Sequence, residues 1–419
     1  MTATLYTLTS GLHTEMADDV RKESFIKDIE TALGAAFEIA GANFSGYGTR
    51  PCELIYVRTG GTEGAFKAVF CKDGGRPAIP EPVRLLTSGK SNSLAASMEI
   101  MSYLNLHGIK GEILHGSPQY IASRILSSSG DDVPAASGLV TSVRPGRILE
   151  GRRLGVVGRP SDWLISSDVD YTAAREVLGV ELVDIRMEEL LDEIAAHSHP
   201  AVELPPLNTP KFGNPIPAGD LDVALDIYGA MLRIIGRHRL DGLTIRCFDL
   251  LGTVHNTGCM ALALLNSQGY TATCEGDVPA MLSMAVARAV CGQSGFQANL
   301  SSIDGDRLLF AHCTVPLSMV GHWVYDTHFE SGFGVAVHGE LPCGPATIFK
   351  LAPDFATAFI AEAELTRNCY EGQLCRTQVI LKAEGLAPYF LTAPIGNHHV
   401  ILTGSHAAAL RQALRQALM

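Results

Sequence analysis

The sequence predicts an α/β protein, with two doubly wound α/β domains followed by a β-rich, barrel-like C-terminal domain. Strand-like and helix-like segments alternate over the first two thirds of the chain, which is typical of parallel sheets. From about Asp304 onward, short β-rich runs are separated by glycine and proline, which is typical of a small antiparallel barrel or sandwich. The chain of 419 residues is also longer than a domain with one hydrophobic core normally is, so more than one domain is expected. We therefore expect domains at residues 1–150, 151–298 and 299–419.

The first domain alternates strands and helices. The runs LYTLTSGL, CELIYVRTGG, PVRLLTSGKSNS and GEILHG predict strands, and helical spacing predicts helices over residues 25–40 and 94–106. Residues 127–151 open rich in serine, glycine and proline, which indicates a linker or long loop.

The second domain repeats this alternation. The runs GRRLGVV and LDGLTIRC predict strands, and amphipathic patterns predict helices over residues 220–238 and 256–269. A short β-like run then ends at Cys274.

Glu275 follows that run directly, at the point where a further helix should begin. Asp277 stands at the N-cap position, Pro279 in the first turn, and Gly292 closes the apolar helical run. In open α/β sheets, ligands bind at the carboxyl ends of the strands. We therefore expect a site to be built around Glu275.

The β-rich domain carries polar residues that composition alone does not require. They stand in the segments AHCTVP, THFESG, CRTQ and GNHHV and comprise His312, His328, Glu330, Arg376, Gln378, His398 and His399. Neighbouring residues on a strand point to opposite faces, so one of the last two histidines can face a pocket while the other is structural. Asn299 and Asp304 lie at the junction of the second and third domains.

These residues indicate one kind of metal chemistry and exclude others. The motifs of helical zinc proteases, zinc deaminases and serine hydrolases are absent. An oxygen-rich site with one imidazole suits Mn²⁺ or Mg²⁺ better than zinc. Such an ion can hold two neighbouring oxygens of a polyol and stabilise an enediolate, while a carboxylate moves the proton between adjacent carbons.

Charge and composition limit the partners. A formal net charge of −12 argues against nucleic acid or an anionic membrane, because both require a basic face. The first residues lack the pattern of a signal peptide, and no apolar stretch is long enough to span a membrane. The ten cysteines include no CxxC pair, which favours buried thiols in a reducing cytoplasm. We expect a cytoplasmic protein that binds a small molecule.

The segments CEGDVPAMLSM, FQAN and GNHHV resemble those of the L-fucose isomerase and related sugar isomerase superfamily, which includes arabinose isomerase more distantly. The resemblance covers most of the chain in architecture and is most specific over residues 244–406. It implies that Glu275 is a metal ligand and acid/base group. It also implies that the ligand histidine is His399, with His398 as the alternative.

The sequence departs from the family pattern at Asn299, which stands where the family has a second carboxylate. An amide can bind a metal but cannot accept a proton. Either another group substitutes, or the reaction differs from simple isomerisation; the candidate substitutes are Asp277, Asp304, His312 and Glu330. The resemblance thus indicates a divergent member.

The resulting hypothesis is a metal-dependent aldose–ketose isomerase that acts on a sugar or an anionic sugar derivative through a cis-enediol. The expected catalytic residues are Glu275, Asp304, His312 and Glu330; the substrate-binding residues are Arg376, Gln378, His328, Arg58 and Asn92; the ligands of Mn²⁺ or Mg²⁺ are Glu275, Asn299, His399 and His398. Two alternatives remain: an epimerase or carbon–carbon lyase using the same enediolate, and a non-catalytic sugar-binding protein. The resemblance further implies a homo-oligomer, a trimer or hexamer, in which a first-domain residue such as Arg58, Glu63, Lys90 or Asn92 reaches a neighbour's site.

Overall fold

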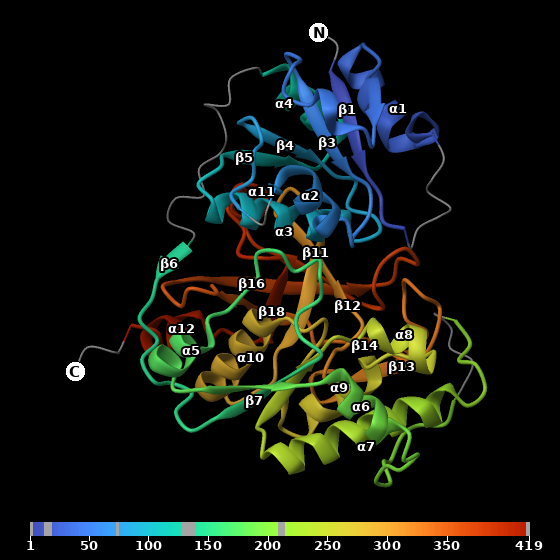
Figure 1. Ribbon diagram of the computed structural model, residues 1–419, viewed down its shortest axis with the longest axis vertical. Coiled ribbons are helices and arrows are strands. Elements are labelled where there is room, and N and C mark those ends of the chain that lie inside the picture. Colours follow the sequence, from blue (N-terminus) through green and yellow to red (C-terminus); the bar gives the residue numbers. More distant parts are fainter. Residues whose placement is uncertain (1–2, 12–18, 73–74, 128–139, 208–213, 416–419) are drawn as a thin grey trace.

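The computed structural model describes residues 3–11, 19–72, 75–127, 140–207 and 214–415. They form two parallel sheets flanked by helices, and an antiparallel barrel that lies between them (Figure 1). The structure therefore has the predicted α/β fold with a β-rich C-terminal part.

The first sheet has five parallel strands in the order β2-β1-β3-β4-β5. They are β1 (Thr4–Leu8), β2 (Glu38–Gly41), β3 (Glu53–Val57), β4 (Val83–Leu86) and β5 (Gly111–Leu114). Leu54 and Tyr56 of β3 pack with α1 (Ser24–Leu33) and α4 (Pro118–Leu126) on one face. Ile55 and Val57 pack with α2 (Glu63–Phe70) and α3 (Ser93–Leu106) on the other. Helices thus cover both faces, as in a doubly wound sheet.

Two local predictions for this region need correction. The helix predicted over residues 25–40 ends at Leu33, because Gly34 adopts a left-handed backbone with φ 65° and terminates it; strand β2 follows. The segment predicted as a linker, 127–151, contains a strand, β6 (Val140–Ser142), which pairs with the barrel. Residues 128–139 of that segment lie outside the described residues.

The second sheet is also parallel, with the order β10-β9-β7-β8. Its strands are β7 (Arg153–Val157), β8 (Glu181–Ile185), β9 (Gly242–Ile245) and β10 (Thr271–Thr273). One face is covered by α5 (Tyr171–Leu178) and α10 (Val278–Cys291), and the other by α6 (Met187–Ile194), α7 (Asp220–His238) and α9 (Cys259–Ser267). Short helix α8 (Asp249–Val254) follows β9. The predicted helix 220–238 is confirmed as α7.

Six antiparallel strands close into a barrel in the order β15-β18-β11-β12-β17-β16, because β15 also pairs with β16. They are β11 (Phe296–Asp304), β12 (Arg307–His312), β15 (Gly344–Leu351), β16 (Thr357–Cys369), β17 (Thr377–Lys382) and β18 (His398–Thr403). Strands β13 (His322–Asp326) and β14 (Ala336–Glu340) form a separate hairpin, and helices α11 (Ala387–Thr392) and α12 (Ala407–Ala413) flank β18 in sequence.

The predicted boundary between residues 298 and 299 falls inside β11. This strand already pairs with β18 at Phe296, opposite Ile401. The end of the second α/β unit therefore lies before β11.

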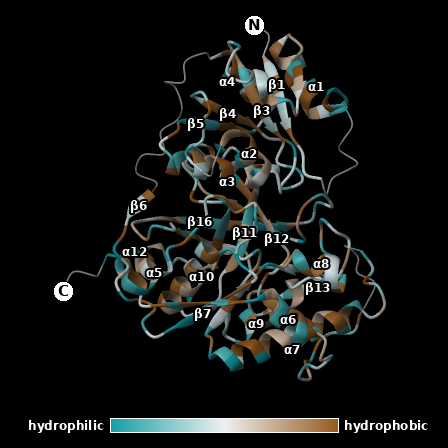
Figure 2. Cartoon of the chain, in the orientation of Figure 1, coloured by the Kyte–Doolittle hydropathy of each residue, from teal (hydrophilic) through white to brown (hydrophobic). Residues whose placement is uncertain are grey.

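The hydropathy of the elements agrees with this layering. Helices α1 and α7 at the periphery carry both polar and apolar residues (Figure 2). Their buried residues face the sheets; Ile26 and Ile29 of α1 are fully buried, for example.

Candidate metal and substrate site

A single cavity joins the three parts of the fold. The space between its lining atoms, including the part open to solvent, is about 450 Å³. The loops after β3 and β4 contribute Glu63 and Asn92, the loops after β7 and β10 contribute Trp163 and Glu275, and β11 contributes Asn299. The carboxyl ends of both parallel sheets therefore open into the same space, as expected for ligand sites of open α/β sheets.

Glu275 occupies a special position in the chain between β10 and α10. Its backbone is left-handed, with φ 66°, a conformation that residues with side chains adopt uncommonly. Such backbone strain, of the order of 1–3 kcal/mol, concentrates at functional sites. Asp277 then caps α10, because its Oδ1 accepts a hydrogen bond from the Ala280 amide at 2.7 Å. The tight turn places both carboxylates at the amino end of one helix.

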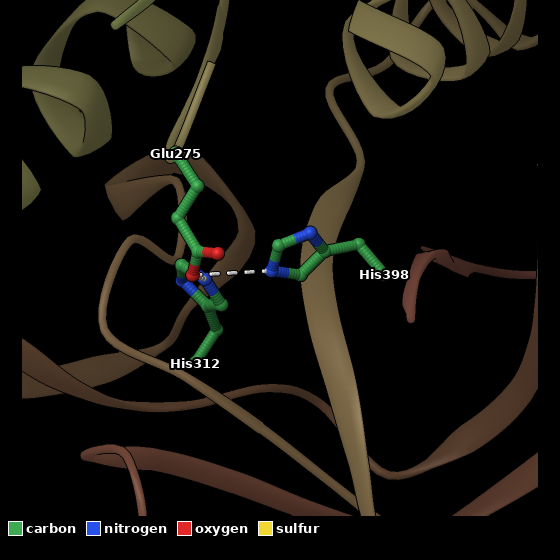
Figure 3. Close-up of side chains that lie close together, drawn as sticks. All are labelled: Glu275, His312 and His398. Carbon is green, nitrogen blue, oxygen red and sulfur yellow. Dashed lines mark ion pairs between the residues drawn. The ribbon is translucent and has the colours of Figure 1, made fainter. Parts of the chain in front are cut away.

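The Glu275 carboxylate lies against the rings of His312 and His398 (Figure 3). Its Oε1 is 3.8 Å from Nε2 of His312 and 3.4 Å from Nε2 of His398. Ligand atoms of the three residues all lie within 4.8 Å of one another. The other oxygen, Oε2, accepts a hydrogen bond from the Trp163 indole at 2.6 Å. We call these three residues, Glu275, His312 and His398, the Glu–His–His cluster.

Partners behind the histidines fix their orientation. Nδ1 of His398 bonds to Oδ2 of Asp277 at 2.8 Å, and Nδ1 of His312 bonds to the Thr314 hydroxyl at 2.9 Å. Lys350, buried to 1% exposure, places Nζ 3.7 Å from the same Asp277 oxygen. Each Nε2 is thereby directed at Glu275, and such partners commonly orient histidine ligands of metals.

In the cluster, neighbouring charges shift the pKa values of Glu275 and His398 in the direction opposite to the effect of burial. Burial alone raises the pKa of Glu275, but the nearby imidazoles of His398 and His312 hold this pKa well below its usual range. Burial alone lowers the pKa of His398, but the carboxylates of Glu275 and Asp277 raise it to about 9. The pKa values of the two groups are thus shifted in opposite directions, as expected for a carboxylate and an imidazole that stabilise each other's charged form.

Two buried polar atoms near the site make no hydrogen bond. They are Oδ1 of Asn299 and Nε2 of His398, although Nε2 of His398 lies 3.4 Å from Oε1 of Glu275. The two residues are directly opposed in the β11–β18 pairing, so their side chains leave the same face of the sheet. Unpaired buried polar atoms are unfavourable, and a cation would satisfy both. The donor set of a carboxylate, two imidazoles and an amide oxygen therefore fits a divalent metal ion.

The structure corrects the preferred histidine from His399 to its alternative, His398. His399 points into the barrel interior, where Nε2 bonds to the Tyr389 hydroxyl at 2.8 Å and the ring packs against Phe359 and Phe390. Burial, together with the charge of Lys350, lowers the pKa of His399 to about 3. Adjacent strand residues point to opposite faces, so only one of the pair can reach the cavity.

Several other predicted residues lie apart from the cavity. Asp304 is exposed in the turn between β11 and β12 and pairs with Arg307 at 2.5 Å. Arg58 is buried against Glu23, with a 2.5 Å ion pair. Neither Asp304 nor Arg58 lines the cavity of its own chain.

The predicted substrate residues of the barrel are also structural. The Arg376 guanidinium donates to the Thr327 carbonyl at 2.8 Å and lies 3.4 Å from Asp326. The Gln378 amide bonds to the backbone of Glu371 and so braces the loop before β17. His328 bonds to Ser331. None of Arg376, Gln378 and His328 lines the cavity.

Two predicted residues from distant parts of the chain do meet in the cavity. Nδ2 of Asn92 donates to Oε1 of Glu330 at 2.6 Å, and both residues line the space. Asn92 reaches this cavity within its own chain.

Trp163 lines the cavity but was not predicted as a site residue, whereas Glu63, expected to reach a neighbour's site, lines the cavity of its own chain. Trp163 follows β7 and Glu63 follows β3, each at the carboxyl edge of its sheet. Applying the sheet-edge rule to every strand, instead of to β10 alone, identifies both.

None of the described helices combines the length and apolarity needed to cross a membrane. Comparison of the sequence with protein-family models and with curated proteins finds no match.

Proposed function

We propose that the protein is a metal-dependent aldose–ketose isomerase that acts on a sugar or sugar derivative through a cis-enediol. The observation that carries the proposal is the Glu–His–His cluster, set beside a cavity of about 450 Å³.

The metal ligands in this proposal are Oε1 of Glu275 and Nε2 of His312 and His398, with Oδ1 of Asn299 as a fourth candidate. The cluster has two imidazoles where one was expected from the sequence. Of the two ions expected, Mn²⁺ suits this set better, because Mg²⁺ prefers oxygen ligands throughout. When bound, the ion would hold neighbouring substrate oxygens and stabilise the negative charge of an enediolate.

The other residues of the cavity have separate tasks in this proposal. Glu275 takes the proton from one substrate carbon and returns it to the next, since its Oε2 is held in place by Trp163. Asn92 and Glu330 bind substrate hydroxyl groups, because their polar ends already meet at the cavity wall.

The test combines a substrate survey with a variant. The Mn²⁺-loaded protein is incubated in D₂O with pentoses, hexoses and anionic hexose derivatives, and products are followed by NMR. The proposal predicts a ketose with its carbon skeleton intact, and loss of turnover in Glu275→Gln. Turnover in metal-stripped protein, or full activity of Glu275→Gln, would contradict it. An epimer or a cleaved skeleton would favour the alternative reactions of an enediolate site, and a sugar bound but unchanged would favour a binding protein.

A further inference from the structure

Glu63 is the second buried carboxyl group of the cavity. It is the first residue of α2, reaches the cavity from the first α/β unit and is 2% exposed. Its Oε2 is buried and has no hydrogen-bond partner. A buried carboxylate normally has hydrogen-bond donors or a cation around it. The unpaired oxygen at the cavity wall is therefore available to bind a ligand.

Glu63 and Glu275 share the cavity but have opposite environments. Burial, reinforced by the negative charges of Glu99 and Glu275, raises the pKa of Glu63 well above its ordinary value, although backbone amides at the start of α2 act in the other direction. The pKa of Glu275, by contrast, is held low by two histidines. Two carboxyl groups in one site whose pKa values are driven apart are suited to separate acid and base roles.

The third carboxyl group at the cavity, Glu330, is less suited to the acid role. Its Oε1 accepts a hydrogen bond from the Asn92 amide, and its side chain is only half-buried. Hydrogen bonding to a carboxylate favours the ionised form. Asn299 has a side-chain amide, which cannot act as an acid at neutral pH.

Resting on the proposed function, we infer that Glu63 is a catalytic acid of this site, which gives its proton to the substrate carbonyl oxygen as Glu275 removes the proton from the neighbouring carbon. The C2–H bond breaks, its electron pair forms the C1–C2 double bond, and the carbonyl π pair forms the new bond between O1 and the proton of Glu63. The products of this step are the neutral cis-enediol, an ionised Glu63 and a protonated Glu275.

The second step restores both residues. Glu275 gives its proton to C1, the double-bond electrons form that C–H bond, and the electron pair of the O2–H bond forms the C2 carbonyl as Glu63 accepts the O2 proton. The net change moves one proton between carbons and one between oxygens, with no oxidant or other reactant.

The protonation state of Glu63 can be tested without turnover. Infrared difference spectra of the metal-free protein at neutral pH compare wild type with Glu63→Gln. We expect the variant to lack one band of a protonated carboxylic acid. The matched variant Glu330→Gln should retain that band, because it leaves Glu63 unchanged. An unchanged acid band in Glu63→Gln would overturn the inference.

The catalytic role is tested on a sugar that the wild type isomerises. Glu63→Gln keeps the volume of the side chain but has no acidic proton, and we expect kcat to fall by about 10²- to 10⁴-fold, as for loss of general acid catalysis. Mn²⁺ affinity should stay within about threefold of wild type, which shows that the site is intact. Glu63→Asp, which keeps the acid on a shorter stem, should recover part of kcat.

Failure of this inference differs from failure of the proposed function. If the wild type isomerises a sugar and Glu63→Gln retains kcat within about threefold, Glu63 is not the acid, while the isomerase proposal stands. If the wild type isomerises none of the sugars, the proposed function and this catalytic role both fall.

Discussion

Replacing Asp277 by asparagine should weaken binding of Mn²⁺ by about 10- to 100-fold, or about 1.4–2.7 kcal/mol. The two oxygens of Asp277 have different partners. Oδ1 accepts from the Ala280 amide and caps α10, while Oδ2 faces Nδ1 of His398. An asparagine that keeps the helix cap must therefore turn its NH₂ group toward His398.

That NH₂ group would reverse the hydrogen bond to the ring. Nδ1 of His398 would have to accept, which places the ring proton on Nε2 and blocks the atom that faces Glu275. If the amide instead flips to keep its oxygen on His398, the helix cap is lost, at about 1 kcal/mol of stability. In both orientations, His398 has lost the negative charge of the Asp277 carboxylate beside its Nδ1.

Mn²⁺ affinity is measured by calorimetry for wild type, Asp277→Asn and a matched control, Asp304→Asn. Asp304 is exposed in a turn, so its variant should bind Mn²⁺ as wild type does. Thermal unfolding of the metal-free proteins checks that each is folded. A folded Asp277→Asn with wild-type affinity would refute the reasoning, because His398 would then not depend on its carboxylate partner as a ligand.

Three further predictions concern the surroundings of the cluster. Tyr389→Phe should lower the free energy of unfolding by about 1–3 kcal/mol in urea titrations, since it leaves Nε2 of His399 and the Ile395 amide without a partner, but should leave Mn²⁺ affinity unchanged. Asn299→Asp should lower the melting temperature of the metal-free protein, because it adds a charge beside Glu275, and should enlarge the increase in melting temperature on adding Mn²⁺. Burial lowers the pKa of His115 to about 4, below the 6.5 of the unfolded chain, so the unfolded state binds the proton first as the pH falls. The free energy of unfolding should therefore fall by up to about 3 kcal/mol between pH 6.5 and pH 4, and His115→Gln should reduce this pH dependence in urea titrations.

The local pattern around Glu275 was enough to predict its place in the fold. Asp277 caps the start of α10, and Gly292 ends the helix in a left-handed backbone conformation, as expected for these residue types. The strand before it ends at the carboxyl edge of a parallel sheet. These features depend on neighbours in sequence and are therefore visible in the sequence.

The choice between His398 and His399 could not be made in this way. Strand parity requires the two to face opposite sides but does not state which side holds the cavity. That depends on the pairing of β18 with β11, which places Asn299 opposite His398. Asp304 likewise belongs to β11 but is its last residue, exposed to solvent at the far end of the strand from His398.

Glu63 shows a second limit of sequence reasoning. It precedes Glu275 by more than two hundred residues, and a glutamate at the start of a helix is usually a solvated residue that stabilises the helix dipole. Packing of the first unit against the other two buries this carboxyl and leaves its Oε2 without a hydrogen-bond partner. Its chemistry is thus a property of the tertiary structure.

The central claim is that the Glu–His–His cluster binds a divalent metal ion, and anomalous X-ray diffraction from crystals grown with Mn²⁺ tests it most directly. We predict one strong anomalous peak bonded to Oε1 of Glu275 and to Nε2 of His312 and His398. A structure with Mn²⁺ present in the crystal but no peak among these three atoms, or with the ion bound by His399 instead, would contradict the account.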